Sequence, residues 1–122
     1  DQVCVQDFGL SGKTLADGLA VGRPSELVAR NMRPLLDGIY TVQDECLPGW
    51  MQRLNETEGV IIEPSACACM GGPKILAGEQ GRAWLKQQGL YEKTAQATHI
   101  VWATGGGLMP EEIITEYLNL SK

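Results

Sequence analysis

The amino-acid sequence predicts an α/β fold in which a parallel sheet is flanked by helices. Two observations predict this fold. Helix-like and strand-like segments alternate along the chain, which is typical of parallel strands joined by helical crossovers. Residues 60–62 are fully apolar and residues 98–103 largely so, as expected for strands that are buried on both faces of a sheet.

The first forty residues predict a strand, a loop, a helix and a second strand. Residues 3–7 alternate weakly between polar and apolar and predict a short strand. Residues 9–18 are rich in glycine and predict a loop. A helix is expected to begin at Pro24 and to be shortened by Pro34. The β-branched run that follows, residues 38–42, predicts the second strand.

The rest of the chain continues the alternation. Asp44 is expected to cap a helix that ends at Gly59. After the apolar strand at residues 60–62, residues 64–76 predict a further helix, and residues 78–96 a polar helical or loop region. The strand at residues 98–103 precedes three glycines and a last helix, which is expected to begin at Pro110.

Length, charge and cysteine content limit the possible classes of protein. The 122 residues predict a single domain, residues 1–122, which we expect to be truncated at its amino end because no leader or initiator Met is present. The net charge of −5 and the lack of a Lys/Arg cluster disfavour nucleic acid and membrane surfaces as partners. The four cysteines lie in apolar stretches and are expected to be buried thiols, which favours a cytoplasmic location.

A hydroxyl residue and three glycines follow the strand at residues 98–103, in the order Thr104-Gly105-Gly106-Gly107. Ligands of open α/β sheets bind beyond the carboxyl ends of the strands, and glycines allow a close approach of backbone to ligand. A flexible turn into the next helix is the alternative interpretation. A phosphate site is disfavoured, because Glu111 and Glu112 would repel the dianion and Pro110 lacks an N–H donor.

Three other positions carry polar groups that have both a chemical and a structural interpretation. Glu63 follows the strand at residues 60–62 and either acts in chemistry or holds a loop. Asp17 and Gly18 are typical of a turn. His99 is the only histidine, so it is a structural side chain or a general base, and a zinc site is disfavoured.

Four stretches of the chain occur in the order Thr14-Leu-Ala-Asp-Gly-Leu-Ala-Val-Gly22-Arg23-Pro24, Leu35-Leu36-Asp37-Gly38-Ile-Tyr40-Thr41, Glu63-Pro64-Ser65-Ala66 and Val101-Trp102-Ala103-Thr104-Gly105-Gly106-Gly107. Together they resemble the carboxy-terminal portion of the D-serine dehydratases (D-serine ammonia-lyases), which are pyridoxal-phosphate (PLP) enzymes. The Glu-Pro-Ser and Ala-Asp-Gly elements are shared with related serine and threonine dehydratases, whereas the Trp-Ala-Thr-Gly-Gly-Gly block with Asp-Gly-Leu-Ala-Val-Gly-Arg points to the D-serine branch. The similarity runs over essentially the whole chain.

The resemblance implies a tryptophan-synthase-β-like large domain, which is fold type II among PLP enzymes. It implies that Thr104, before Gly105, faces the pyridine nitrogen of the cofactor, that Asp17 and Gly18 lie beside the cofactor ring, and that Glu63 lies near it. The implied reaction is the α,β-elimination of D-serine to pyruvate and ammonia. The implied cofactors are PLP and a monovalent cation.

Two elements of that family are missing from this sequence. Neither the motif of the Schiff-base lysine nor the phosphate-binding glycine loop is present. We therefore expect the 122 residues alone to be inactive as a lyase and to need the amino-terminal part of the same protein as a partner. Self-association is a further expectation, because such a piece exposes sheet edge and apolar surface. A non-catalytic α/β binding or regulatory module derived from this scaffold is the alternative.

Overall fold

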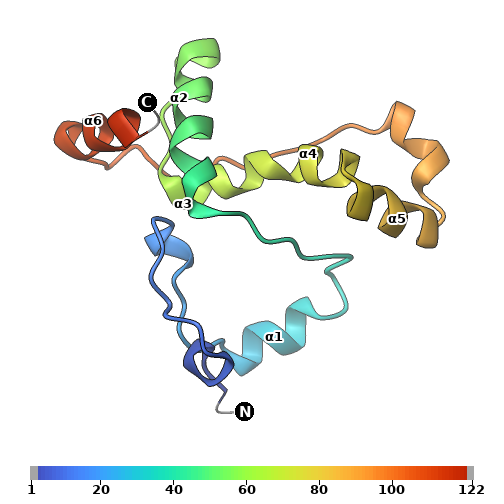
Figure 1. Ribbon diagram of the computed structural model, residues 1–122. Helices are drawn as coiled ribbons and strands as arrows, with labels where there is room; N and C mark the ends of the chain where they lie inside the picture. The colour runs from blue at the N-terminus through green and yellow to red at the C-terminus, as the bar shows by residue number, and fades with distance from the viewer. Residues whose placement is uncertain (1–2, 121–122) are drawn as a thin grey trace.

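The computed structural model describes residues 3–120, and within that range its regular structure is entirely helical (Figure 1). Residues 1–2 and 121–122 of the predicted domain lie outside the described residues. Six α-helices occur in the order α1 (Glu26–Met32), α2 (Leu47–Glu58), α3 (Pro64–Cys67), α4 (Gly72–Ala77), α5 (Glu79–Gln87) and α6 (Glu111–Leu120). Short 3-10 helices are η1 (Val5–Phe8), η2 (Asp17–Leu19), η3 (Asp44–Cys46), η4 (Ala68–Gly71) and η5 (Tyr91–Gln96).

Local sequence signals account for the ends of α1. The Ser25 hydroxyl caps the helix by accepting a hydrogen bond from the Val28 N–H at 3.4 Å. Glu26 and Arg30 form an i, i+4 ion pair of 2.7 Å on its surface. The helix ends at Met32, ahead of Pro34, as the sequence predicted.

The end of α2 was predicted correctly, but its start was not. Gly59 adopts φ 66° and donates its N–H to the Asn55 carbonyl, which closes the helix. Asp44 is not the cap. It is the first residue of η3, and the N-cap position of α2 is Cys46. The Asp44 carboxylate instead bonds to a distant loop, described below.

The helices predicted after residue 64 are present but interrupted. Three short helices, α3, η4 and α4, occupy the stretch for which the sequence predicted a single helix, residues 64–76. Pro64 and Pro73 each lie in the first turn of a piece, where a proline is tolerated. The polar region up to Gln96 contains α5 and η5, and α6 begins at Glu111 after Pro110.

The predicted parallel sheet is not formed within the described residues. Residues 5–8 form η1 instead of a strand, because the Asp7 carboxylate accepts the Cys4 N–H at 2.8 Å and closes a local turn. The other three predicted strands, residues 38–42, 60–62 and 98–103, run as single non-helical stretches. An apolar pattern indicates that a segment is buried. A β-strand forms only where a neighbouring segment pairs with the N–H and C=O groups of that segment.

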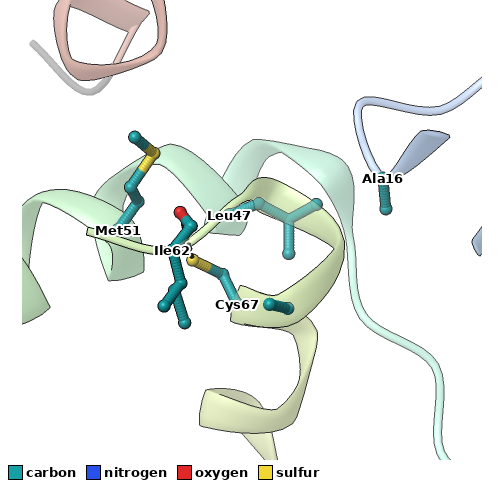
Figure 2. Packing of buried hydrophobic residues seen from close by; sticks show 6 residues of the cluster. Ala16, Leu47, Met51, Ile62 and Cys67 are labelled. Carbon is teal, nitrogen blue, oxygen red and sulfur yellow. Dashed lines mark hydrogen bonds between the residues drawn. The ribbon is translucent and has the colours of Figure 1, made fainter. Parts of the chain in front are cut away.

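The hydrophobic core lies where α3 packs against α2 and against the η2 turn. Leu47, Met51 and Cys67 are fully buried there, and Ile62 and Ala16 pack with them (Figure 2). Helix α6 contributes partly buried side chains against the same cluster. The core therefore joins the η2 turn to the segment that leads into α3.

Outside this core the molecule is open (Figure 1). Its accessible surface is 9660 Å², whereas a compact monomer of 13.2 kDa would expose about 6,400 Å². Much of the excess is apolar: Ile100 is 85% exposed and Trp102 is 78% exposed. The expectation that residues 98–103 are buried on both faces is thus wrong for this chain. None of the helices in residues 3–120 has the length and apolarity needed to cross a membrane.

Candidate functional site

One cavity brings together segments from three distant parts of the sequence. It has a volume of about 530 Å³, within the range of small-molecule sites. Its walls are Asp17 in η2, Glu63 and Pro64 at the start of α3, residues 104–110, and one face of α6. The cavity therefore lies where the stretch at residues 60–62 and the stretch at residues 98–103 both end.

Four of the five predicted cofactor-binding residues line this cavity. They are Asp17, Glu63, Thr104 and Gly105. The fifth, Gly18, lies just behind the wall, since a Cβ atom placed on it would stand 3.5 Å from Glu63 Oε1. The structure thus places the five predicted residues around one cavity, although the predicted sheet is not formed within residues 3–120.

Glycines at residues 105 and 106 allow two segments to meet closely. The Glu63 N–H donates to the Gly105 carbonyl at 3.2 Å. A Cβ atom on Gly105 would stand 2.8 Å from the Glu63 carboxylate, and one on Gly106, which has φ 139°, would stand 2.5 Å from Ile62 Cα. Gly106 therefore excludes any side chain, because the close atoms are backbone, whereas a side chain at residue 105 would require the Glu63 carboxylate to move.

Asp17 is held in place by short-range and long-range hydrogen bonds. The Gly18 N–H donates to Asp17 Oδ1 at 2.7 Å and to the Ser65 hydroxyl at 2.9 Å. The Ser65 hydroxyl in turn donates to Asp17 Oδ1 at 3.5 Å. Ser65 is buried at the start of α3, so the turn that carries Asp17 is anchored to a helix.

The charge of the cavity is negative. Asp17 and Glu63 contribute carboxylates, Thr104 contributes a neutral hydroxyl, and the described lining contains no Lys, Arg or His. A phosphate dianion is disfavoured in such a site, which agrees with the acidic start of α6. A ligand group with a positive charge or with hydrogen-bond donors is favoured.

Sequence reasoning missed the contribution of α6. Ile113 and Tyr117 both line the cavity, and their i, i+4 spacing places them on one face of the helix. That spacing was visible in the sequence. Ser65 was seen only as part of a motif, and no local signal pairs it with a turn 47 residues away.

The remaining candidate side chains lie away from this site. His99 is exposed.

All four cysteines are free thiols; Cys67 is buried, whereas Cys46 is exposed, contrary to the expectation that all four are buried. Burial raises the pKa of the Cys67 thiol to about 11, and nearby Cys69 adds to this shift. In the described part of the chain, no three His, Cys, Asp or Glu side chains gather as they would around a metal ion.

Comparison with known proteins identifies close relatives, although no protein-family model matches the chain. The chain is 48% identical over 123 residues to the D-serine dehydratase of Photorhabdus laumondii, a match that covers 100% of this chain and 27% of that protein. It is 48% identical over 117 residues to a probable D-serine dehydratase of Halalkalibacterium halodurans, covering 96% of this chain and 26% of that protein. A probable D-serine dehydratase of Geobacillus stearothermophilus is 46% identical over 118 residues. The chain spans about a quarter of the length of these relatives, and across its whole length it is therefore similar to a segment of the D-serine dehydratases.

Proposed function

We propose that this chain forms part of the cofactor site of a PLP-dependent D-serine dehydratase, a lyase that converts D-serine into pyruvate and ammonia. One observation carries the proposal. Four of the five residues to which the family resemblance assigns cofactor contacts line a single cavity, and they come from three distant parts of the sequence. The identity of 48% to proteins named D-serine dehydratase supports the choice of substrate.

The cavity fits the ring end of PLP and not its phosphate end. Thr104 offers a neutral hydroxyl, which can bond to a pyridine nitrogen without holding it protonated as a carboxylate would. Gly105 and Gly106 have no side chain to fill the space beside Glu63. The two carboxylates in the wall leave the phosphate to be bound by other segments.

When bound, PLP supplies an electron-withdrawing ring that accepts the charge left at the α-carbon of the amino acid, so that the β-hydroxyl can leave. This chain's own residues would orient the ring and limit its protonation. Thr104 would bond to the ring nitrogen, and the carboxylates of Asp17 and Glu63, next to Gly18 and Gly105, would lie at the edge of the ring. Ile113 and Tyr117 supply apolar cover from α6.

We propose that the rest of a D-serine dehydratase polypeptide is the partner of this chain. The relatives are about four times as long, and the chain exposes about half as much surface again as a compact monomer of its mass. Ile100 and Trp102 expose apolar side chains on a single stretch, as expected of a strand whose neighbours belong to that partner. Self-association through the same stretch is the competing arrangement.

We further propose that the 122 residues alone do not turn over D-serine, because the sequence contains no lysine in the motif that carries PLP in this family. A cytoplasmic location and a monovalent cation as second cofactor stay predictions; the four free thiols support the first of these.

A segment exchange tests the proposal. This chain replaces the matching 123 residues of the Photorhabdus laumondii relative, and pyruvate formation from D-serine is measured together with PLP absorbance. We expect a PLP-loaded protein that forms pyruvate. T104S is expected to keep most of the activity and T104V to lose on the order of tenfold or more, because only serine retains the hydroxyl. A chimera that folds and binds PLP but forms no pyruvate would contradict the dehydratase assignment.

A non-catalytic binding or regulatory module is the second candidate, and the missing lysine motif favours it. Such a module would form a stable chimera that neither acquires PLP absorbance nor responds to T104V. The same experiment therefore separates the two functions.

A further inference from the structure

Asp44 makes two hydrogen bonds to a loop that is far away in the sequence. Its Oδ1 accepts from the Thr14 hydroxyl at 2.6 Å, and its Oδ2 accepts from the Leu15 N–H at 2.7 Å. Both bonds are partly buried, and the residues are separated by 30 and 29 positions. Bonds of this kind to a charged acceptor are stronger than those between neutral groups.

The carboxylate of Asp44 is not used to cap its own helix. Asp44 is the first residue of η3, whose N-cap, Gln43, makes no side-chain capping bond, and α2 begins three residues later. Both carboxylate oxygens face the loop instead. Asp44 therefore connects the start of the α2 segment to residues 14–15.

Further hydrogen bonds connect Thr14 to the turn that carries Asp17 in the cavity wall. The Thr14 hydroxyl accepts the Ala16 N–H at 3.0 Å, and the Ala16 side chain is buried in the core. The Ala16 carbonyl accepts the Leu19 N–H at 2.8 Å, which closes the η2 turn that carries Asp17. Asp17 lies between Ala16 and the closed turn, so it has little freedom to move away from the cavity wall.

We propose that Asp44 is a positioning residue that places Asp17 in the wall of the cavity by holding residues 14–16. The positioning itself follows from the geometry, while its consequence for PLP rests on the proposed function. Asp44 does not line the cavity, so its effect there is indirect and passes through Thr14 and Ala16.

Amide hydrogen exchange measured by NMR on this chain tests the positioning. In D44N and T14V we expect exchange of the Leu15, Ala16 and Gly18 amides to accelerate by about tenfold. D44N loses one acceptor of the anchor, and T14V loses the bonds of the Thr14 hydroxyl to Asp44 and to the Ala16 N–H. Amides in the middle of α2 are expected to change by less than about twofold. T14S keeps the hydroxyl and is expected to behave like the unmodified chain. E45Q is the matched control, because it removes a carboxylate from the adjacent, exposed position of the same turn.

A PLP titration of the chimera that carries the same substitutions, followed by PLP absorbance, adds a second readout. The chimera is used because we propose that the lysine and the phosphate site belong to the rest of the polypeptide. We expect the affinity for PLP to fall about tenfold in D44N and T14V and to be unchanged in T14S and E45Q. If the unmodified chimera does not bind PLP, the proposed function fails, while the exchange rates still decide whether Asp44 positions the turn.

Two results would overturn the inference. The first is an unchanged Gly18 amide in both D44N and T14V. The second is equal acceleration throughout α2 in T14V, which would mean that Thr14 and Asp44 support the helix in general and not the turn. T14V is decisive here, because it leaves the Asp44 carboxylate and its bond to the Leu15 N–H in place.

Discussion

Gly105 lies directly against Glu63: the Glu63 N–H donates to the Gly105 carbonyl, and a Cβ atom on Gly105 would stand 2.8 Å from the Glu63 carboxylate. This contact joins two stretches that are separated by some forty residues. It is also the contact that brings Thr104 and Glu63 to the same cavity. A side chain at residue 105 would therefore require the Glu63 carboxylate to move within the site.

G105A is expected to displace the Glu63 side chain and to lower the free energy of unfolding by about 1–3 kcal/mol, because the added methyl group meets a well-packed contact. Urea denaturation measures the change. G107A is the control: a Cβ atom there meets nothing within 4 Å, and the backbone has no positive φ. Equal losses in the two variants would show that the Glu63 contact is unimportant.

Gly18 and Ser65 are expected to be energetically coupled. G18A places a methyl group 2.9 Å from the Ser65 hydroxyl oxygen, and S65A removes that oxygen together with its bond to the Gly18 N–H. The penalty of G18A should therefore be smaller in the S65A background, by about 0.5–1 kcal/mol. A double-mutant cycle by denaturation measures this difference, and strictly additive effects would contradict the contact.

Leu47 is fully buried at the centre of the core. L47A is expected to lower the free energy of unfolding by about 2–5 kcal/mol, since it removes apolar contacts and leaves a cavity. L108A, at a leucine that is 100% exposed, is expected to change it by less than about 0.5 kcal/mol. Thermal unfolding followed by circular dichroism distinguishes the two. A similar small effect at both sites would argue against this core.

The pKa of Cys67 gives a prediction at alkaline pH. Burial raises this pKa to about 11 in the folded protein, above its ordinary value, so the folded state binds more protons than the unfolded state between these values. Stability from this group is fully present below the unfolded pKa and is lost as the pH rises through the folded pKa.

The loss expected from Cys67 is about 2 kcal/mol between roughly pH 9 and pH 11. It is measured as the difference in pH dependence between the unmodified chain and C67A, with C46A as the exposed control. Parallel curves for the unmodified chain and C67A would contradict the prediction.

Substitution of Trp102 should change the stability of the isolated chain and of the chimera by different amounts. Because its side chain is 78% exposed here, W102S is expected to change the free energy of unfolding of this chain by less than about 0.5 kcal/mol. In the chimera, where we propose that a partner covers this stretch, the same substitution should cost about 3 kcal/mol or more. Urea denaturation of both proteins measures the effects. Small effects in both would show that no partner covers this stretch.

Several features of the fold were predictable because they depend on neighbouring residues. Ser25 and Pro34 bound α1, and Gly59 ends α2, as their backbone preferences require. The candidate site was predictable for a different reason: family resemblance assigned Asp17, Glu63 and Thr104 to one ligand, and they line one cavity. Ile113 and Tyr117 were overlooked, although their helical spacing was visible.

Other features were decided by residues far away in the sequence. The carboxylate of Asp44 suits a helix cap equally well, yet it bonds to Thr14 and Leu15, because the core brings that loop within reach. The apolar stretch at residues 98–103 indicates a buried strand, yet no neighbour pairs with it among residues 3–120.

The sequence by itself thus determined the end of α1 ahead of Pro34 and the end of α2 at Gly59, since these depend on local backbone preferences. Only the tertiary structure decided which groups bond across the chain and which apolar stretches stay exposed. The physical reason is that hydrogen bonding and burial are properties of pairs of segments, and a pattern within one segment does not specify its partner.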